Sequence, residues 1–171
     1  MLSATWQYSV RALVHLAVAR GKAPILASHI AEAEGIPLPF LSKILHQLKI
    51  AGVVTATRGQ KGGYIMQRDP HTLSLLEIAR LTDHVDFGEQ CLLGYKFCSS
   101  HTNCVMHRDW EGIKQEIYSF LEHMTVGKLA QDFARGNLDM EGMMHFRQPP
   151  LRPPYEVTDL EAEEEIHRGR R

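Results

Sequence analysis

The 171-residue sequence predicts a mostly α-helical protein with one small β-hairpin. Three observations predict this fold class. Apolar residues recur at helical spacing in several segments, and glycines follow these segments where a helix would end. Two short stretches that contain β-branched or aromatic residues flank a glycine-rich turn, which is typical of a hairpin. A hydrophobic content of 44% and a charged content of 23% fit one globular domain with an appended arm.

The first half of the chain predicts three helices. The first covers 3–19 and stops before Gly21, and the second is an alanine-rich segment over 27–34 that Gly35 closes. The third covers 37–51. It begins with Pro37 and Pro39, which fall in the first helical turn, where proline is tolerated. The apolar positions that indicate the first and third helices are Trp6, Val10, Leu13, Val14, Ala17, Leu41, Ile44, Leu45 and Leu48.

Two strands follow the third helix, over 53–57 and 63–67, with the turn 58–62 between them. Three helices followed by a β-hairpin are the outline of a winged helix-turn-helix, in which the hairpin is the wing. The tight turn between the second and third helices then falls around Gly35. The sequence therefore predicts a winged helix-turn-helix.

The second half predicts three further helices. Ser74 and Glu77 form a capping-box pattern that opens a nine-residue helix over 75–83. A longer helix over 105–124 carries an apolar stripe, and a last short helix follows over 125–133, capped by its threonine. The stripe consists of Trp110, Ile113, Ile117, Phe120, Leu121 and Met124.

A long apolar helix outside the first domain requires a partner surface. Symmetric dimers dominate among soluble oligomers, so a second copy of the same helix is the economical partner. We therefore expect a homodimer. From about residue 147 the chain carries proline pairs and charge blocks without periodicity, which predicts a disordered tail.

Charge is unevenly distributed along the chain. Residues 1–69 carry eight Lys or Arg against three Asp or Glu, whereas residues 70–146 carry six against eleven. A basic first half is typical of a surface that meets a polyanion, although chance scatter of surface charge is the alternative. No apolar run approaches the roughly 20 residues of a membrane span, and no secretory signal is visible. We therefore expect a cytoplasmic protein with no membrane partner and with reduced thiols.

The third predicted helix, 37–51, is the candidate DNA-reading helix. In a helix-turn-helix the second helix of the motif enters the major groove with its N-terminal residues nearest the bases. Lysine suits phosphate or guanine contacts, and serine and glutamine can read base edges. A merely solvated helix face is the alternative interpretation. The candidate DNA-binding residues on this helix are Pro39, Ser42, Lys43, His46 and Gln47.

The turn RGQKGGY, over 58–64, is the second candidate DNA contact. Glycines let the backbone take positive φ and approach another surface closely. A cationic tip of this kind fits a phosphate backbone or a minor groove, whereas an ordinary glycine-rich turn is the alternative. The candidate DNA-binding residues of the wing are Arg58, Gly59, Lys61 and Tyr64.

All three cysteines lie in CLLGYKFCSSHTNCVMH, over 91–107. An odd cysteine count in a reducing compartment argues against a disulfide framework. Thiolates suit an iron–sulfur cluster or zinc, but structural zinc sites usually have tighter C-x-x-C pairs. Cys104 and His107 are three residues apart at a helix start, so both can face one ligand. A cluster is the favoured interpretation, while zinc and a loop without a ligand stay open.

The stretch GIPLPFLSKILHQLKIAGVVTATRGQKGGYIM, over 35–66, together with the cysteine loop, resembles the Rrf-two family of bacterial transcription regulators. The similarity runs from the first helix to about residue 133 and leaves the tail uncovered. Its most specific element is the RG-x-x-GGY wing followed by three spaced cysteines. The resemblance implies a homodimer that binds a pseudo-palindromic operator in double-stranded DNA, with the long helices crossing at the dimer interface.

The resemblance also implies a set of cluster ligands. Cys91, Cys98 and Cys104 match the three cysteine ligands of the iron–sulfur branches of the family. His107 matches the fourth ligand of the IscR-type branch, where the cluster is 2Fe–2S, although the first gap differs by one residue. In the NsrR-type branch an acidic residue of the first helix completes a 4Fe–4S site. The matching position here is Gln7, so we expect a 2Fe–2S rather than a 4Fe–4S cluster.

The sequence therefore predicts a DNA-binding transcriptional regulator that senses redox state, iron–sulfur status or nitric oxide. Its expected parts are a winged helix-turn-helix domain over 1–83, a cluster-binding loop over 84–104, a dimerisation helix and C-terminal helix over 105–146, and a tail over 147–171. A regulator without a cluster, responding to a small ligand, zinc or cysteine oxidation, is one alternative. An iron–sulfur electron-transfer protein is another. We expect no enzyme, because the chain has no phosphate loop, nucleophile elbow or triad spacing.

Overall fold

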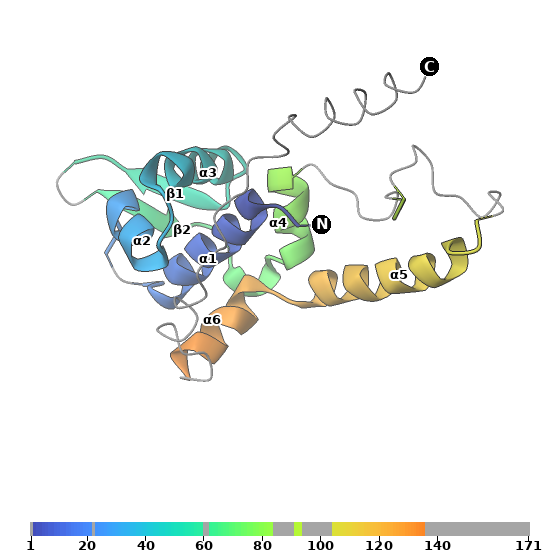
Figure 1. Ribbon diagram of the computed structural model, residues 1–171. Coiled ribbons are helices and arrows are strands. Elements are labelled where there is room, and N and C mark those ends of the chain that lie inside the picture. The colour runs from blue at the N-terminus through green and yellow to red at the C-terminus, as the bar shows by residue number, and fades with distance from the viewer. Residues whose placement is uncertain (1, 22, 60–61, 84–90, 94–103, 136–171) are drawn as a thin grey trace, which may run out of the picture. The chain divides into compact units, whose positions relative to one another are not determined.

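The computed structural model describes residues 2–21, 23–59, 62–83, 91–93 and 104–135 (Figure 1). The elements in chain order are α1 (Ala4–Val18), α2 (Ala27–Glu34), α3 (Leu38–Ile50), β1 (Val54–Thr57), β2 (Gly63–Met66), the 3-10 turn η1 (Pro70–Thr72), α4 (Leu75–Asp83), α5 (His107–His123) and α6 (Val126–Ala134). The predicted fold class, mostly α-helical with a hairpin after the third helix, is confirmed. Among the described helices, none combines the length and the apolar character needed to cross a bilayer.

The core of the described residues is built around α1. This helix buries Ala12 and Leu13 completely and packs against α3, α4 and α6 (Figure 1). The largest fully buried side chains are Leu13, Ile30, Leu41, Ile44, Leu45, Leu48, Leu73, Leu76, Ile78, Val53, Val54 and Val126. Removing each of these side chains from water contributes roughly 1.5–3 kcal/mol before the entropy cost of ordering it. The four helices α1, α3, α4 and α6 therefore share one apolar core.

The turn between α2 and α3 forms where the sequence predicts it. Gly35 ends α2 with a left-handed backbone, at a φ of 59°, which glycine adopts without a steric penalty. The amide of Ile36 then donates to the carbonyl of Ala31 at 2.9 Å, which satisfies a carbonyl at the end of α2. Pro37 is the N-cap of α3, so the candidate DNA-reading helix starts within one residue of its predicted position.

The hairpin pairs β1 with β2 in antiparallel fashion, and the pairing ends with Thr57 opposite Gly63. The connection between α1 and α2 lies beside β2. There the amide of Tyr64 donates to the carbonyl of Ile25 at 2.8 Å, and the amide of Ile25 donates to the carbonyl of Tyr64 at 3.0 Å. The wing is therefore attached to the connection between α1 and α2 by backbone hydrogen bonds at the start of β2.

Replacing Gly63 with alanine is expected to lower the free energy of unfolding by about 2 kcal/mol. Gly63 has a φ of 144°, and a Cβ there would lie 2.5 Å from backbone atoms of Ile25, which cannot rotate away. Urea unfolding measures the loss. Gly52→Ala is the matched control, because Gly52 also has a positive φ, 69°, but has open space around its Cα. Equal losses in the two variants would mean that the contact with Ile25 does not matter.

Ser74 caps α4, because its Oγ accepts a hydrogen bond from the amide of Glu77 at 3.1 Å. The Glu77 carboxylate binds the Arg68 guanidinium through both of its oxygens, one of them at 3.2 Å. This hydrogen bond holds the pKa of Arg68 above its usual range. The predicted capping box is thus present in its serine half, while the glutamate side chain connects the exit of the hairpin to α4.

Thr125 separates α5 from α6 and caps α6 with its side chain, as predicted. The residues on either side of this cap pair with the residues that precede α4. The amide of Leu75 donates to the carbonyl of Met124 at 2.9 Å, and the amide of Val126 donates to the carbonyl of Leu73 at 3.0 Å. The start of α4 and the junction of α5 with α6 are therefore held together by main-chain bonds.

Candidate nucleic-acid interface and metal centre

Helix α3 presents a polar face to solvent and buries the opposite face. The leucines and the isoleucine of its inner face are each at most 1% exposed. The predicted DNA-binding residues Pro39, Ser42, Lys43, His46 and Gln47 are all exposed. Their spacing of three and four residues places them on one side of the helix. The helix carries no Asp or Glu, so its outer face has only neutral and basic side chains.

The tip of the wing exposes Arg58 and Gly59, as predicted. Gly59 has a φ of 108°, which favours glycine. A Cβ on Gly62 would lie 2.3 Å from the carbonyl oxygen of Thr57, so a larger residue cannot occupy this turn without moving the backbone. The predicted DNA contact Lys61 lies outside the described residues.

Tyr64 has a different environment from the tip of the wing. Its side chain is half-buried and packs against the core. It lines a hollow of about 170 Å³ between the end of α1 and β2, and its main chain is paired with Ile25. The structure therefore gives Tyr64 a packing role, and its predicted contact with DNA stays a prediction.

The described part of the cysteine region places Cys104 directly before α5. Cys104 is exposed, and its carbonyl accepts a hydrogen bond from the amide of His107, the half-buried first residue of α5, at 3.0 Å. The helix begins two residues later than the predicted 105, because residues 104–106 form a turn. Cys91 is half-buried, and Cys98 lies outside the described residues.

Helix α5 carries an exposed apolar stripe. Ile113, Ile117 and Phe120 are 49%, 40% and 58% exposed and recur at i, i+4 and i+7. Met106, just before the helix, is also exposed and continues the same stripe. Leu121, on the side that faces α4, is only 2% exposed. An apolar stripe of this length on a single helix is typical of a protein–protein contact.

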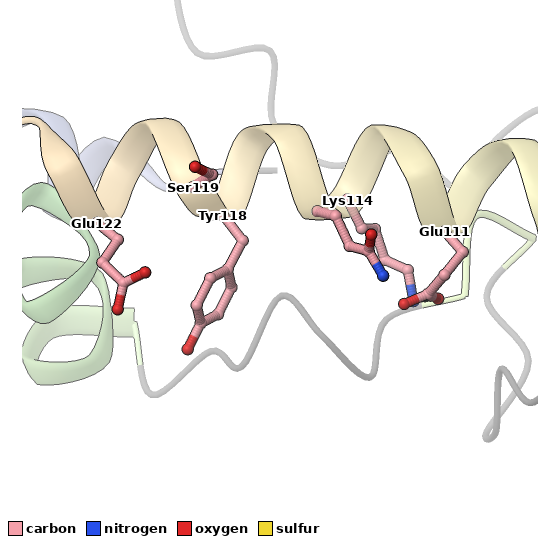
Figure 2. Close-up of a pocket in the computed structure, with 6 residues that line it drawn as sticks. Glu111, Lys114, Tyr118, Ser119 and Glu122 are labelled. Carbon is pink, nitrogen blue, oxygen red and sulfur yellow. Dashed lines mark ion pairs between the residues drawn. The ribbon is translucent and has the colours of Figure 1, made fainter.

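A third face of α5 is polar and slightly hollowed. Figure 2 shows Glu111, Lys114, Tyr118, Ser119 and Glu122 around a shallow pocket of about 210 Å³. Lys114 pairs with Glu111 at 2.7 Å, and this ion pair holds the pKa of the Glu111 carboxyl below its usual range. The hollow is shallow, and its lysine is already paired with Glu111, so we assign no ligand to it.

A protein-family model described as "Iron-dependent Transcriptional regulator" matches residues 2–132. The chain belongs to the Rrf2 (Rrf-two) family. The predicted family resemblance is therefore confirmed, and so is the prediction that the protein is not an enzyme, because the relatives of this Rrf2 protein are transcriptional regulators.

Three relatives illustrate the similarity. The HTH-type transcriptional regulator IscR of Vibrio vulnificus strain YJ016 is 30% identical over 131 residues, which are 77% of each chain. The solved structure of T. potens IscR is 26% identical, with a TM-score of 0.64 over 85% of this chain and 96% of that chain. CymR of B. subtilis, described as the global cysteine regulator, has a TM-score of 0.67 over 77% and 96% of the two chains. At 21% identity the likeness to CymR shows the fold alone.

The donor chemistry of this Rrf2 protein fits an iron–sulfur cluster. Thiolates and an imidazole are ligands that iron in a cluster accepts, and zinc accepts the same set. Within the described ranges, no three His, Cys, Asp or Glu side chains converge as a metal site. The predicted set Cys91, Cys98, Cys104 and His107 therefore stays a prediction.

Sequence reasoning missed a buried carboxylate that positions the helix-turn-helix. Glu34, at the end of α2, is only 4% exposed. It accepts from Arg11 Nε at 3.3 Å and lies 3.0 Å from His15 Nδ1, and the Arg11 guanidinium also donates to the Glu34 carbonyl. These bonds fix the end of α2 against α1, one residue before the turn that leads to α3. A carboxylate at an inward helical position was the signal that could have revealed it.

Proposed function

We propose that this Rrf2 regulator binds double-stranded DNA as a homodimer and senses redox state, iron–sulfur status or nitric oxide through a bound cluster. The observation that carries the proposal is the position of His107. The proposed ligand is the first residue of α5, and α5 also carries the exposed apolar stripe. One helix would therefore join the sensor to the dimer interface. The description of the matching family model, "Iron-dependent Transcriptional regulator", supports a regulator that responds to iron.

Cys91, Cys98, Cys104 and His107 would hold the cluster. An imidazole fourth ligand favours 2Fe–2S over 4Fe–4S, and the exposed Gln7 of α1 offers an amide instead of the anionic ligand that the 4Fe–4S branch uses. When bound, the cluster would supply a centre that reacts with oxidants and nitric oxide and that is lost when iron is scarce. Zinc in the same set of ligands is the alternative that metal analysis separates.

We divide the chain accordingly into a winged helix-turn-helix domain over 1–83, a cluster-binding loop over 84–104, a dimerisation and C-terminal part over 105–146, and a tail over 147–171. Two copies related by a two-fold axis would present two α3 helices, which matches a pseudo-palindromic operator. The spacing of these helices would depend on where α5 places each domain. The DNA affinities of the loaded and cluster-free forms should then differ by a coupling free energy of ~1–3 kcal/mol.

Anaerobic purification followed by iron and acid-labile sulfide analysis tests the proposal. We expect coloured protein with iron and sulfide in equal amounts, and a DNA affinity that changes when the cluster is removed and rebuilt. Colourless protein containing zinc would replace the cluster with a zinc site. Protein without any metal, whose DNA affinity responds to a thiol oxidant, would favour the regulator without a cluster.

Arg58→Ala is expected to weaken binding to most DNA sequences by about tenfold and to lower the salt dependence by about one unit per subunit. An arginine at the exposed wing tip would contact phosphates, which are common to all sequences. Gln47→Ala should instead change the preference among operators, because Gln47 lies on the base-reading face of α3. Binding titrations at several salt concentrations measure both effects. Arg135→Ala, an exposed arginine at the end of α6, is the control, and an Arg58→Ala affinity equal to that control would exclude the wing.

A further inference from the structure

Helix α4 lies between the two parts of the protein that the proposed function connects. It contacts α1, which belongs to the winged helix-turn-helix, and it contacts α5, which begins at the proposed ligand His107. α1 also contacts α2 and α3 directly. Any change in the position of α5 can therefore reach the DNA-reading helix through α4 and α1.

The first turn of α1 is bonded to both ends of α4. At one end, the Asp83 carboxylate accepts from the Ser3 amide at 3.0 Å and from Ser3 Oγ at 2.5 Å. At the other end, the Trp6 indole Nε1 donates to the carbonyl of Leu75 at 3.1 Å. Ser3 Oγ is also the N-cap of α1, since it accepts from the Trp6 amide at 3.1 Å. The carboxylate of Asp83 thus holds the residue that starts α1.

The middle of α4 is bonded to α5. The Arg80 guanidinium donates to the Tyr118 hydroxyl, and its central carbon lies 5.5 Å from the centre of the Tyr118 ring. A hydrogen bond combined with a cation–π contact fixes both the distance and the direction of approach. Helical periodicity places Tyr118 on a different side of α5 from the apolar stripe, so a dimer formed through the stripe would leave this contact in place.

The remaining contact joins α1 to the first turn of α3, the proposed DNA-reading helix. The Tyr8 ring of α1 meets the Phe40 ring of α3 edge to face, at 6.3 Å between centroids. Phe40 follows Pro39, the first of the proposed DNA-binding residues. Aromatic pairs of this geometry are directional. The first turn of α3 is therefore positioned by the same helix whose first turn is held by Asp83.

We propose that Arg80 and Asp83 of α4 are positioning residues that couple the state of the cluster to the orientation of α3. This inference rests on the proposed function and adds the contacts that carry the coupling. Neither residue is among the proposed cluster ligands or the proposed DNA contacts. Arg80 sets α4 against α5, and Asp83 sets α1 against α4. Loss of either contact leaves both ends of the regulator intact but weakens the coupling between them, while the main-chain bonds between the start of α4 and the end of α5 remain.

The test compares DNA affinity with and without the cluster, in anaerobic material, for Asp83→Asn and Tyr118→Phe. An asparagine can accept only one of the two Ser3 hydrogen bonds, and a phenylalanine keeps the ring but loses the acceptor for Arg80. The quantity measured is the ratio of the two dissociation constants, larger over smaller. We expect each variant to lower this ratio by a factor of at least about five. A factor of about five is the lower end of the range for allosteric coupling.

Asp69→Asn is the matched control. Asp69 is also a capping carboxylate bound to a distant partner, since it accepts from the His71 amide at 3.2 Å and from Arg20 Nη1 at 2.8 Å. It belongs to neither α4 nor α5, so its replacement should leave the ratio unchanged. Iron content and the melting temperature, measured for all variants, separate a loss of coupling from a loss of the cluster or of the fold.

The outcomes distinguish this inference from the proposed function. Wild-type protein without iron, or with a ratio of one, would overturn both. If the ratio of dissociation constants is well above one in the wild-type protein, and Asp83→Asn and Tyr118→Phe both keep it, the inference alone is overturned. If Asp83→Asn does not fold, Tyr118→Phe decides, because it removes one surface hydroxyl and no apolar contact. Faster hydrogen exchange at the first turn of α1 in Asp83→Asn would confirm that the contact holds Ser3 in solution.

Discussion

Replacing Ile117 with glutamate is expected to convert the proposed dimer to monomers and to lower operator affinity by at least about a hundredfold. Ile117 lies at the centre of the exposed apolar stripe of α5, between Ile113 and Phe120. In the proposed dimer two copies of this stripe face each other, so the substitution would place two like charges in an apolar interface. A monomer can engage only one half-site, and the loss of the second typically costs a factor of ~10²–10⁴.

Sedimentation and operator titrations of the same samples measure these effects. Ser119→Glu is the matched control, since Ser119 is exposed on the polar face of α5 shown in Figure 2 and receives the same charge. The control should remain dimeric and bind DNA as the parent does. An Ile117→Glu protein that stays dimeric would show that the two copies associate through another surface.

The elements of this fold were predictable where local signals agree. The helix α4 was predicted over 75–83 and occupies those residues, because Ser74 supplies the cap and the apolar spacing supplies the inner face. Glycine at position 35 fixed the end of α2 in the same way, since few other residues adopt its left-handed backbone. Caps, stops and periodicity act within a few residues, so one sequence is enough to identify them.

The contacts that position the site were not predictable, because they join residues far apart in the chain. In the sequence, Asp83 is only the polar last residue of an amphipathic helix, and only the tertiary fold brings it to Ser3. Glu34 occupies an inward position of α2, but its partners Arg11 and His15 lie 23 and 19 residues away in the sequence, and only the fold brings them to it. Tyr64 packs against the core beside a backbone paired with Ile25, a contact that its motif does not reveal, and its predicted contact with DNA stays a prediction.

Replacing Cys104 with alanine is expected to abolish the visible absorption of anaerobically purified protein and to remove its iron. Cys104 lies in the turn that leads into α5, so its loss would remove a proposed cluster bond directly before this helix. Loss of an outer-shell partner weakens a metal site by about 10–100-fold, and loss of a thiolate ligand should exceed that range. The substitution changes no buried side chain, so the fold should remain intact.

His107→Cys tests the fourth ligand without removing it. A thiolate in place of an imidazole keeps four bonds to the cluster but adds negative charge, which lowers the reduction potential, because histidine ligands raise the potential of 2Fe–2S centres. We therefore expect a coloured protein with an altered spectrum and a lower midpoint potential. His123→Cys, at the other end of α5, is the control, since His123 is exposed and its Nδ1 lies 2.7 Å from the Ser119 carbonyl of its own helix. A potential that stays unchanged in His107→Cys would assign the fourth bond to another residue, and Cys104 would then be the proposed ligand that connects the cluster to the start of α5.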